Sequence, residues 1–231
     1  MSDSRIRRFF AGWTRKEIAW FMFCVGFVCF VSISLGDGVL PTLAAVTGVV
    51  FTILAGKGQR LCYCFGMINA PLYAYISFTE AYYGDMALNV FYFAMMFAGL
   101  YSWSRNQSGD EAKGIKREKL SLHESLWWGA SVFSATACLW FILEKAGGSR
   151  PLCDSLTNVL SVAAMMLTVR RAIEQWILWI VVNALEVYMW FRVWFEGGNN
   201  VSILLMWLLF LVNGIYLLRL WVKVGVEERR R

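Results

Sequence analysis

A small set of amide and aromatic side chains lies inside otherwise apolar stretches of the chain, where each could contact a bound molecule. The candidate substrate-binding residues are four amides and three aromatics: Asn69, Asn89, Asn183, Asn213, Tyr92, Trp176 and Trp179. Amides donate and accept hydrogen bonds, and Trp or Tyr faces stack on flat rings, more strongly on cationic ones. No Arg or Lys lies deep in these stretches, which argues against a phosphorylated or carboxylate ligand. The set predicts a site for a neutral or cationic, polar, ring-containing solute.

Helical spacing places several of these residues on shared faces. Asn89 and Tyr92 are three residues apart, and Trp176, Trp179 and Asn183 follow at intervals of three and four. An asparagine inside a membrane can also serve only to bridge two helices, at about 1 kcal/mol or less per hydrogen bond. Trp stripes, likewise, often form packing contacts or interfacial belts. At the level of sequence both interpretations stay open for each residue.

Other kinds of chemistry find little support in the sequence. The six cysteines contain no CxxC pair, His123 is the single histidine, and no GxxxxGK[ST] loop occurs. We therefore expect no metal, no cofactor and no enzyme activity. An intramembrane enzyme that uses Asp154, Glu174 or Glu186 as acid or base is the least favoured alternative. Within a membrane Glu186 could also pair with a cation, relay a proton or stay neutral, and its role is left open.

The composition defines the environment that must position these residues. The 231 residues are 58% hydrophobic and only 16% charged, whereas a soluble domain carries about 25% charged residues. So few charges could not cover the surface of a soluble protein, and disorder requires low hydrophobicity. A polytopic membrane protein is the class that fits.

Long apolar runs predict an all-α bundle of about eight transmembrane helices. The expected spans are Glu17–Leu35, Val39–Ala55, Leu61–Thr79, Asp85–Trp103, Glu124–Leu143, Ser155–Val169, Ile173–Phe195 and Val201–Val222. The first run is long for a signal peptide and has only a weak cleavage site, so we expect a retained span. Gly48, Gly66 and Gly99 are expected to allow close helix packing.

The few charges predict the orientation of these spans. Basic residues gather in the N-terminal tail, in every second connection and at the C-terminus, while the connections between them are short and acidic or mixed. The positive-inside rule then places both termini in the cytoplasm. The net charge of +6 and the pI of about 9.1 are explained by the anionic lipid bilayer, without a nucleic-acid partner.

A weak internal repeat relates the two halves of the chain. Asn69 and Asn183 are 114 residues apart, and three spans follow the same order in each half, with the fifth span joining them. Such a parallel repeat places a substrate site between the halves near the middle of the membrane. We expect an N-terminal helix in 1–38, a first repeat in 39–104, a loop and linker helix in 105–151, a second repeat in 152–222 and a basic tail in 223–231.

Four stretches make the chain resemble the PnuC family of nicotinamide riboside transporters. They are Phe65-Gly66-Met67-Ile68-Asn69, Gly99-Leu100-Tyr101-Ser102-Trp103, the run Glu174-x-Trp176-x-x-Trp179-x-x-x-Asn183, and Asn213-Gly214. The third is the most specific. The resemblance covers nearly the whole chain beyond the first span.

The resemblance implies a three-plus-one-plus-three core similar to SWEET sugar transporters, and a homotrimer in the bacterial cytoplasmic (inner) membrane. It implies facilitated diffusion of nicotinamide riboside, a vitamin B3 precursor, by alternating access, with uptake driven by a separate cytoplasmic kinase. Asn69, Trp176, Trp179, Asn183 and Asn213 match family positions. Asn89 falls where another amide can stand, and Glu186 has no place in the pattern.

Two further interpretations remain open. A related carrier for thiamine or riboflavin would use the same scaffold, and Glu186 keeps a thiamine carrier in consideration. A structural membrane scaffold would show a sealed helix bundle without a central cavity.

Overall fold

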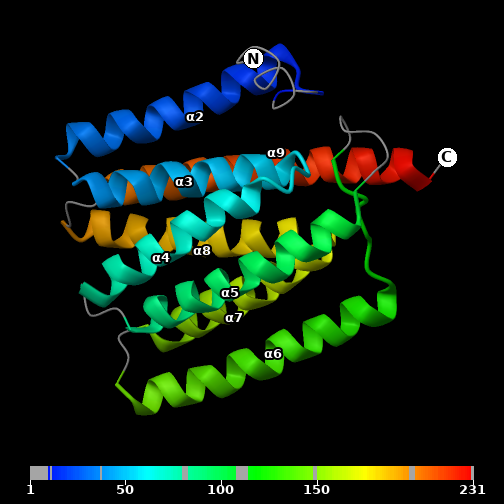
Figure 1. Ribbon diagram of the computed structural model, residues 1–231. Helices are drawn as coiled ribbons and strands as arrows, with labels where there is room; N and C mark the ends of the chain where they lie inside the picture. Colours follow the sequence, from blue (N-terminus) through cyan, green and yellow to red (C-terminus); the bar gives the residue numbers. More distant parts are fainter. Residues whose placement is uncertain are drawn as a thin grey trace. The chain divides into compact units, whose positions relative to one another are not determined.

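The chain folds into helices, and the longest connection joins α5 to α6 (Figure 1). The computed structural model describes residue 10 and residues 12–36, 38–79, 83–107, 114–147, 150–197 and 201–229. At residues 201, 202 and 227–229 it describes the backbone only. The basic residues expected before residue 10, at 108–113 and at 230–231 lie outside them. Within the described part are α2 (Arg15–Ser34), α3 (Val39–Gly56), α4 (Cys62–Thr79), α5 (Tyr83–Arg105), α6 (Leu122–Lys145), α7 (Pro151–Arg170), α8 (Gln175–Phe195) and α9 (Val201–Arg229).

Each predicted span corresponds to one of these eight helices, so the expectation of an all-helical membrane bundle is confirmed. Seven are long and apolar enough to cross a membrane. The remaining helix, α4, has 18 residues but contains Asn69, Pro71 and several tyrosines, which lower its hydropathy. Most helix ends agree within a few residues. Helix α9 continues to Arg229, past the expected end at Val222.

Two helices begin with the same local motif. Thr14 caps α2 and Ser121 caps α6, each accepting a backbone hydrogen bond from a glutamate three residues on. Each glutamate returns a contact to the backbone N–H of its cap residue, which completes a capping box. Among the described residues, each of these helices is followed by three more that pack in sequence order.

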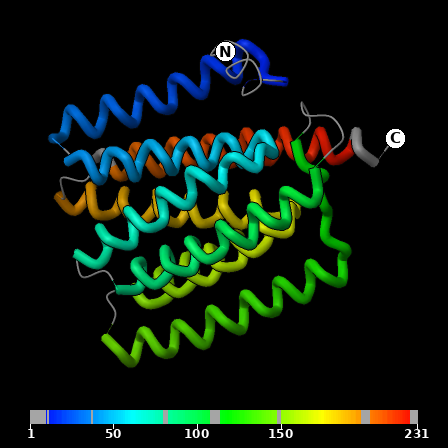
Figure 2. Tube along the Cα trace, in the orientation of Figure 1, coloured from blue at the N-terminus to red at the C-terminus, as the bar shows by residue number. Residues whose placement is uncertain are grey.

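The first unit comprises residues 1–116. Helices α2, α3, α4 and α5 pack in sequence order, each against the next (Figure 2). Tyr63, in the first turn of α4, is fully buried against the last part of α5, with its ring edge-on to Trp103 at 5.1 Å. The absence of a side chain at Gly99 makes this contact possible, since a Cβ there would lie 2.1 Å from the Tyr63 ring. Gly66 similarly faces Met96, as expected for packing glycines.

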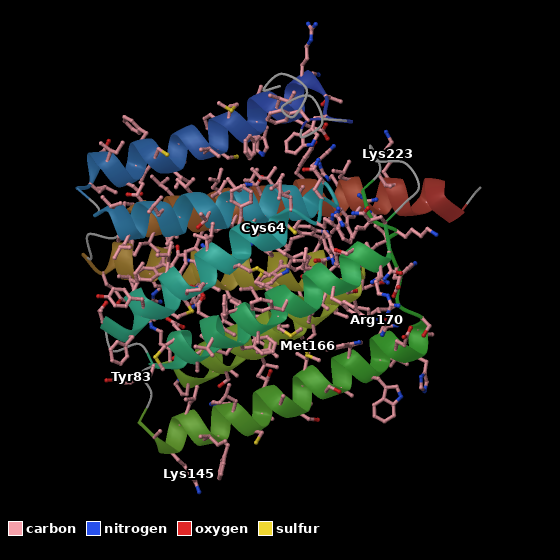
Figure 3. All side chains as sticks on the ribbon, in the orientation of Figure 1. Cys64, Tyr83, Lys145, Met166, Arg170 and Lys223 are labelled. Carbon is pink, nitrogen blue, oxygen red and sulfur yellow. The ribbon has the colours of Figure 1, made fainter. Side chains whose placement is uncertain are left out.

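The second unit comprises residues 117–231. Helices α6, α7, α8 and α9 again pack in sequence order. Helix α6, expected as a linker, packs against α7 and is mostly exposed along its length. Within this unit Arg170 and Lys223 lie toward one end and Lys145 at the other (Figure 3). We call the end at which α7 finishes and α8 begins the basic end of this unit.

Candidate functional site

Helix α8 carries three of the seven candidate residues, and α7 orients one of them. The indole Nε1 of Trp179 donates a hydrogen bond to the hydroxyl oxygen of Thr168 on α7, at 3.2 Å. That hydroxyl in turn donates to the Ala164 carbonyl at 2.8 Å. The Trp179 ring is therefore held in one orientation, and it stays partly exposed. A partly exposed indole with a fixed ring plane can serve as a stacking surface.

Asn183 lies one helical turn further along α8, near the middle of the helix. It is 8% exposed, and no hydrogen bond to its side chain occurs among the residues that the structure describes. Its Nδ2 lies against α9, 3.7 Å from where a Cβ would stand on Gly214. Asn213, the neighbour of that glycine, is 1% exposed. The structure thus brings an uncommitted amide on α8 close to the expected Asn213-Gly214 pair on α9.

Trp176, at the start of α8, has a different environment. Its side chain is 3% exposed and packs edge-on against Trp221 of α9, with ring centroids 5.7 Å apart. The guanidinium of Arg117 lies over the other ring of this pair, 5.0 Å from the centroid of Trp221. A direct contact of Trp176 with substrate would require this packing to change. In this conformation Trp176 belongs to the packing at the basic end.

In the first unit, Asn69 joins two helices. Its Nδ2 donates to the Ala44 carbonyl of α3 at 2.6 Å and lies 3.4 Å from the Thr47 hydroxyl. A Cβ on Gly48 would lie 3.0 Å from the same nitrogen, so the glycine makes room for the amide. The bridging role left open for membrane asparagines is thus realised here.

Asn89 and Tyr92 lie on α5, where their spacing placed them. The Nδ2 of Asn89 donates to the Asp85 carbonyl of the same helix at 2.8 Å, so it satisfies its own backbone. Tyr92 is half-buried, and its ring lies 6.1 Å from that of Phe91. On α8, Glu186 is half-buried three residues beyond Asn183. Among the described residues no group of acids, cysteines and histidine could hold a metal ion.

The structure adds one residue that the sequence did not single out and places a second one, known only as part of a motif. Thr168 fixes the Trp179 indole, yet it stands eleven residues earlier, on the other side of a helix break. Gly214 was noted as part of a motif, and the structure places it against α8, where a Cβ would stand 3.1 Å from Ile180 and 3.7 Å from Asn183 Nδ2. A hydroxyl in the last turn of an apolar run was the available signal for Thr168, and such hydroxyls commonly bond only their own helix.

Comparison with known proteins agrees with this arrangement over nearly the whole chain. The profile of the nicotinamide mononucleotide transporter family matches residues 38–223. The nicotinamide riboside transporter PnuC of Neisseria mucosa is 34% identical over 94% of this chain and 85% of the relative. The protein of the same name from Haemophilus influenzae is 28% identical over 94% of both chains. The crystal structure of the vitamin B3 transporter PnuC superposes with a TM-score of 0.83 and 34% identity, covering 96% of both chains.

The fold and its membrane-spanning helices define an integral membrane protein of the transporter class. The chain belongs to the nicotinamide mononucleotide transporter family. The resemblance seen in the sequence is confirmed. The relatives are named as transporters, in agreement with the expectation that the chain is not an enzyme.

Proposed function

We propose that this protein transports nicotinamide riboside across the cytoplasmic membrane of a bacterium. Three relatives that carry this name, from Neisseria mucosa, Haemophilus influenzae and Escherichia coli, match most of the chain. One observation supports a location for the binding site. The buried side-chain amide of Asn183, which makes no hydrogen bond among the described residues, lies one turn beyond the oriented ring of Trp179. This pair offers a stacking face and a hydrogen-bonding group on one helix.

The chemistry of the substrate suits this pair. Nicotinamide riboside has a cationic pyridinium ring, a carboxamide and a ribose. The Trp179 face would stack on the ring, because an aromatic face attracts a cationic partner. Asn183 would hold the ribose hydroxyls or the carboxamide, and we keep Asn213, Asn69, Asn89, Tyr92 and Trp176 as further contacts that the transport cycle could bring to the substrate.

The site favours the riboside over its phosphate. The family is described by the mononucleotide, whereas the named relatives carry the riboside in their names. Residues 176–191 of α8 and 203–218 of α9 contain no Arg or Lys. A phosphate placed among them would lose its water without gaining a cation, which is costly.

We further propose facilitated diffusion by alternating access, in which the two halves rock about the site. The division of the chain into two compact units supports such rigid bodies. Phosphorylation of the substrate by a separate cytoplasmic kinase would draw uptake inward. Charge sorting supports cytoplasmic termini, since Arg170 and Arg171 share one end of the second unit with Lys223. The homotrimer remains an inference from the family.

A binding titration of the purified protein tests the substrate. We expect calorimetry to detect saturable binding of nicotinamide riboside and none of nicotinamide mononucleotide at the same concentration. Thiamine and riboflavin are titrated as the alternative substrates. The half-buried carboxyl of Glu186 on α8 could pair with a cationic vitamin such as thiamine. Binding of thiamine or riboflavin without binding of nicotinamide riboside would overturn the proposal. Uptake into liposomes without an ion gradient separates facilitated diffusion from coupled transport.

A further inference from the structure

A short stretch of backbone adds itself to the elbow between α7 and α8. The N–H of Glu118 donates to the Arg171 carbonyl at 3.0 Å, and the N–H of Ile173 donates to the Glu118 carbonyl at 2.9 Å. Two residues later, the N–H of Leu120 donates to a carboxylate oxygen of Glu174 at 3.2 Å. We call residues 117–120 the strap. It is held just before α8 begins by two backbone–backbone hydrogen bonds and one from a backbone N–H to a side-chain carboxylate.

Ion pairs reinforce the strap at the same place. The Glu118 carboxylate accepts a hydrogen bond from Arg171 and lies 3.6 Å from Nε of Arg170. Arg170 also pairs with Glu124, the capping glutamate of α6. The side chain of Arg171 is only 8% exposed, and a buried guanidinium requires a paired carboxylate. Glu118 therefore supplies a paired carboxylate for the buried guanidinium of Arg171.

Arg171 also holds an unusual backbone conformation. Its φ is +66°, in the left-handed region, where a residue with a side chain is disfavoured. This conformation ends α7 and turns the chain so that α8 can start four residues later. The carboxylate of Glu118 holds the side chain of the one residue that makes the turn. Losing that carboxylate would loosen the elbow at its strained position.

The elbow leads directly into the tryptophans of α8. Helix α8 begins at Gln175, so Trp176 lies in its first turn and Trp179 in its second. The strap contacts this part of the unit a second time, because Arg117 lies over Trp221, which packs against Trp176. The first two turns of α8 thus lie next to the strap, with α9 in contact with Trp176 and α7 bonded to Trp179.

The first unit contains a matching anchor without tryptophans beyond it. Lys57 stands 114 residues before Arg171, at the end of α3, and pairs with Glu17 at 2.9 Å. The two side chains are 12% and 11% exposed. Its Nζ also lies 5.5 Å from the Trp13 ring centroid. Each elbow is therefore held by a buried cation that pairs with an acid. In the first unit the acid lies outside α3–α5, and in the second unit it lies outside α7–α9. Only the second elbow leads into the helix that carries Trp179 and Asn183.

We propose that Glu118 is a positioning residue for the transport site: it fixes the α7–α8 elbow through Arg171 and thereby sets the placement of the α8 tryptophans. The proposal rests on the proposed function for the location of the site. Glu118 does not touch the substrate in this scheme. Its effect reaches the ligand through the first two turns of α8, in the way that supporting residues orient those that bind.

Glu118→Gln tests the proposal, with Glu17→Gln as the matched control in the first unit. Both changes remove one carboxylate charge and keep a hydrogen-bond acceptor. We expect Glu118→Gln to weaken binding of nicotinamide riboside about fivefold, the equivalent of roughly one net hydrogen bond. We also expect faster amide hydrogen exchange at 175–182. Glu17→Gln should lower the melting temperature and leave the dissociation constant unchanged. Glu118→Asp, which keeps the charge, should restore most of the affinity.

A loss of melting temperature without a change in affinity or in exchange at 175–182 would show that Glu118 only stabilises the fold and would overturn the proposal. If Glu118→Gln does not fold, the double variant with Arg171→Gln, which leaves no buried unpaired charge, carries the same two measurements. If the unmodified protein does not bind nicotinamide riboside, the proposed function fails. Hydrogen exchange at 175–182 then still decides whether Glu118 positions α8.

Discussion

The two units each contain an asparagine inside a helix, and the two side chains have different partners. Asn69 on α4 and Asn183 on α8 stand 114 residues apart. The Asn69 amide is committed to the Ala44 carbonyl of α3, whereas the Asn183 amide makes no hydrogen bond within the described part of the chain. A buried amide without partners costs free energy unless a ligand or water satisfies it. The Asn69 amide is thus used within the fold, whereas the proposed function assigns the Asn183 amide to the substrate.

Gly99 of the first unit and Gly214 of the second also differ in the side chains that they face. In the first unit Gly99 is closed by the Tyr63 ring, which lies between Phe51 and Trp103. In the second, Gly214 faces the flexible side chain of Ile180 and the Asn183 amide, at greater distances. Large rings fill the first contact, while the second leaves a polar group at the helix interface. A contact filled by buried rings in one unit and a contact with a buried amide in the other fit the structural and binding roles that we propose for them.

Adding one methyl group at these glycines should give the largest difference. A Cβ at position 99 would lie 2.1 Å from a fully buried ring, so Gly99→Ala forces Tyr63 out of its packing. We expect a loss of about 2 kcal/mol in stability, the usual cost of overpacking, seen as a lower melting temperature in detergent. Gly214→Ala meets Ile180 at 3.1 Å and should cost much less.

The second glycine should instead affect ligand binding. A methyl group at position 214 would touch Asn183 Nδ2, so we expect weaker binding of nicotinamide riboside in Gly214→Ala with little change in melting temperature. Equal losses of melting temperature in Gly99→Ala and Gly214→Ala would show that the two helix contacts are packed equally tightly, and would contradict this prediction.

Removing the amides themselves should separate binding from stability. We expect Asn183→Ala to weaken binding of nicotinamide riboside about tenfold or more, since a buried hydrogen bond to the ligand is lost. Trp179→Ala should do the same through loss of the stacked ring. Asn69→Ala removes the bridge to Ala44 and should lower the melting temperature while the dissociation constant stays within about threefold. Unchanged affinity in both Asn183→Ala and Trp179→Ala, in folded protein, would place the site elsewhere.

Much of the fold could be predicted from the sequence because membrane helices have a strong one-dimensional signal. A run of apolar residues, interrupted by glycine or charge, marks a span whatever its neighbours are. Even α4, with Asn69 and Pro71, lies within such a run. We expected α6 to join the two halves only because the number of spans requires it. Its packing against α7 depends on contacts between two helices, which the hydropathy of one helix does not predict.

The candidate site was harder to predict, because the use of a polar group depends on its partners in three dimensions. Asn69 and Asn183 look alike in the sequence, and only the Ala44 carbonyl near one of them distinguishes their roles. Trp176 and Trp179 belong to one motif, yet one is covered by Trp221 and the other is held by a hydroxyl. Such differences arise from a neighbouring helix, which spacing along one helix cannot reveal.

The smallest expected effect concerns the exposed ion pair at the far end of α8, in contrast to the buried pair of Lys57 and Glu17. Arg192 lies 2.8 Å from Glu196, and its hydrogen bond lowers the pKa of that carboxyl below the ordinary value. A lowered pKa stabilises the fold above the unfolded pKa, and this contribution is lost as the pH falls through the folded value. Arg192→Gln should return the pKa of Glu196 toward normal, as measured by NMR titration of labelled glutamate. Melting temperature and affinity at neutral pH should not change, because an exposed pair contributes little. A pKa that stays low would instead assign the effect to Arg150, whose Nη2 lies 3.9 Å from Glu196.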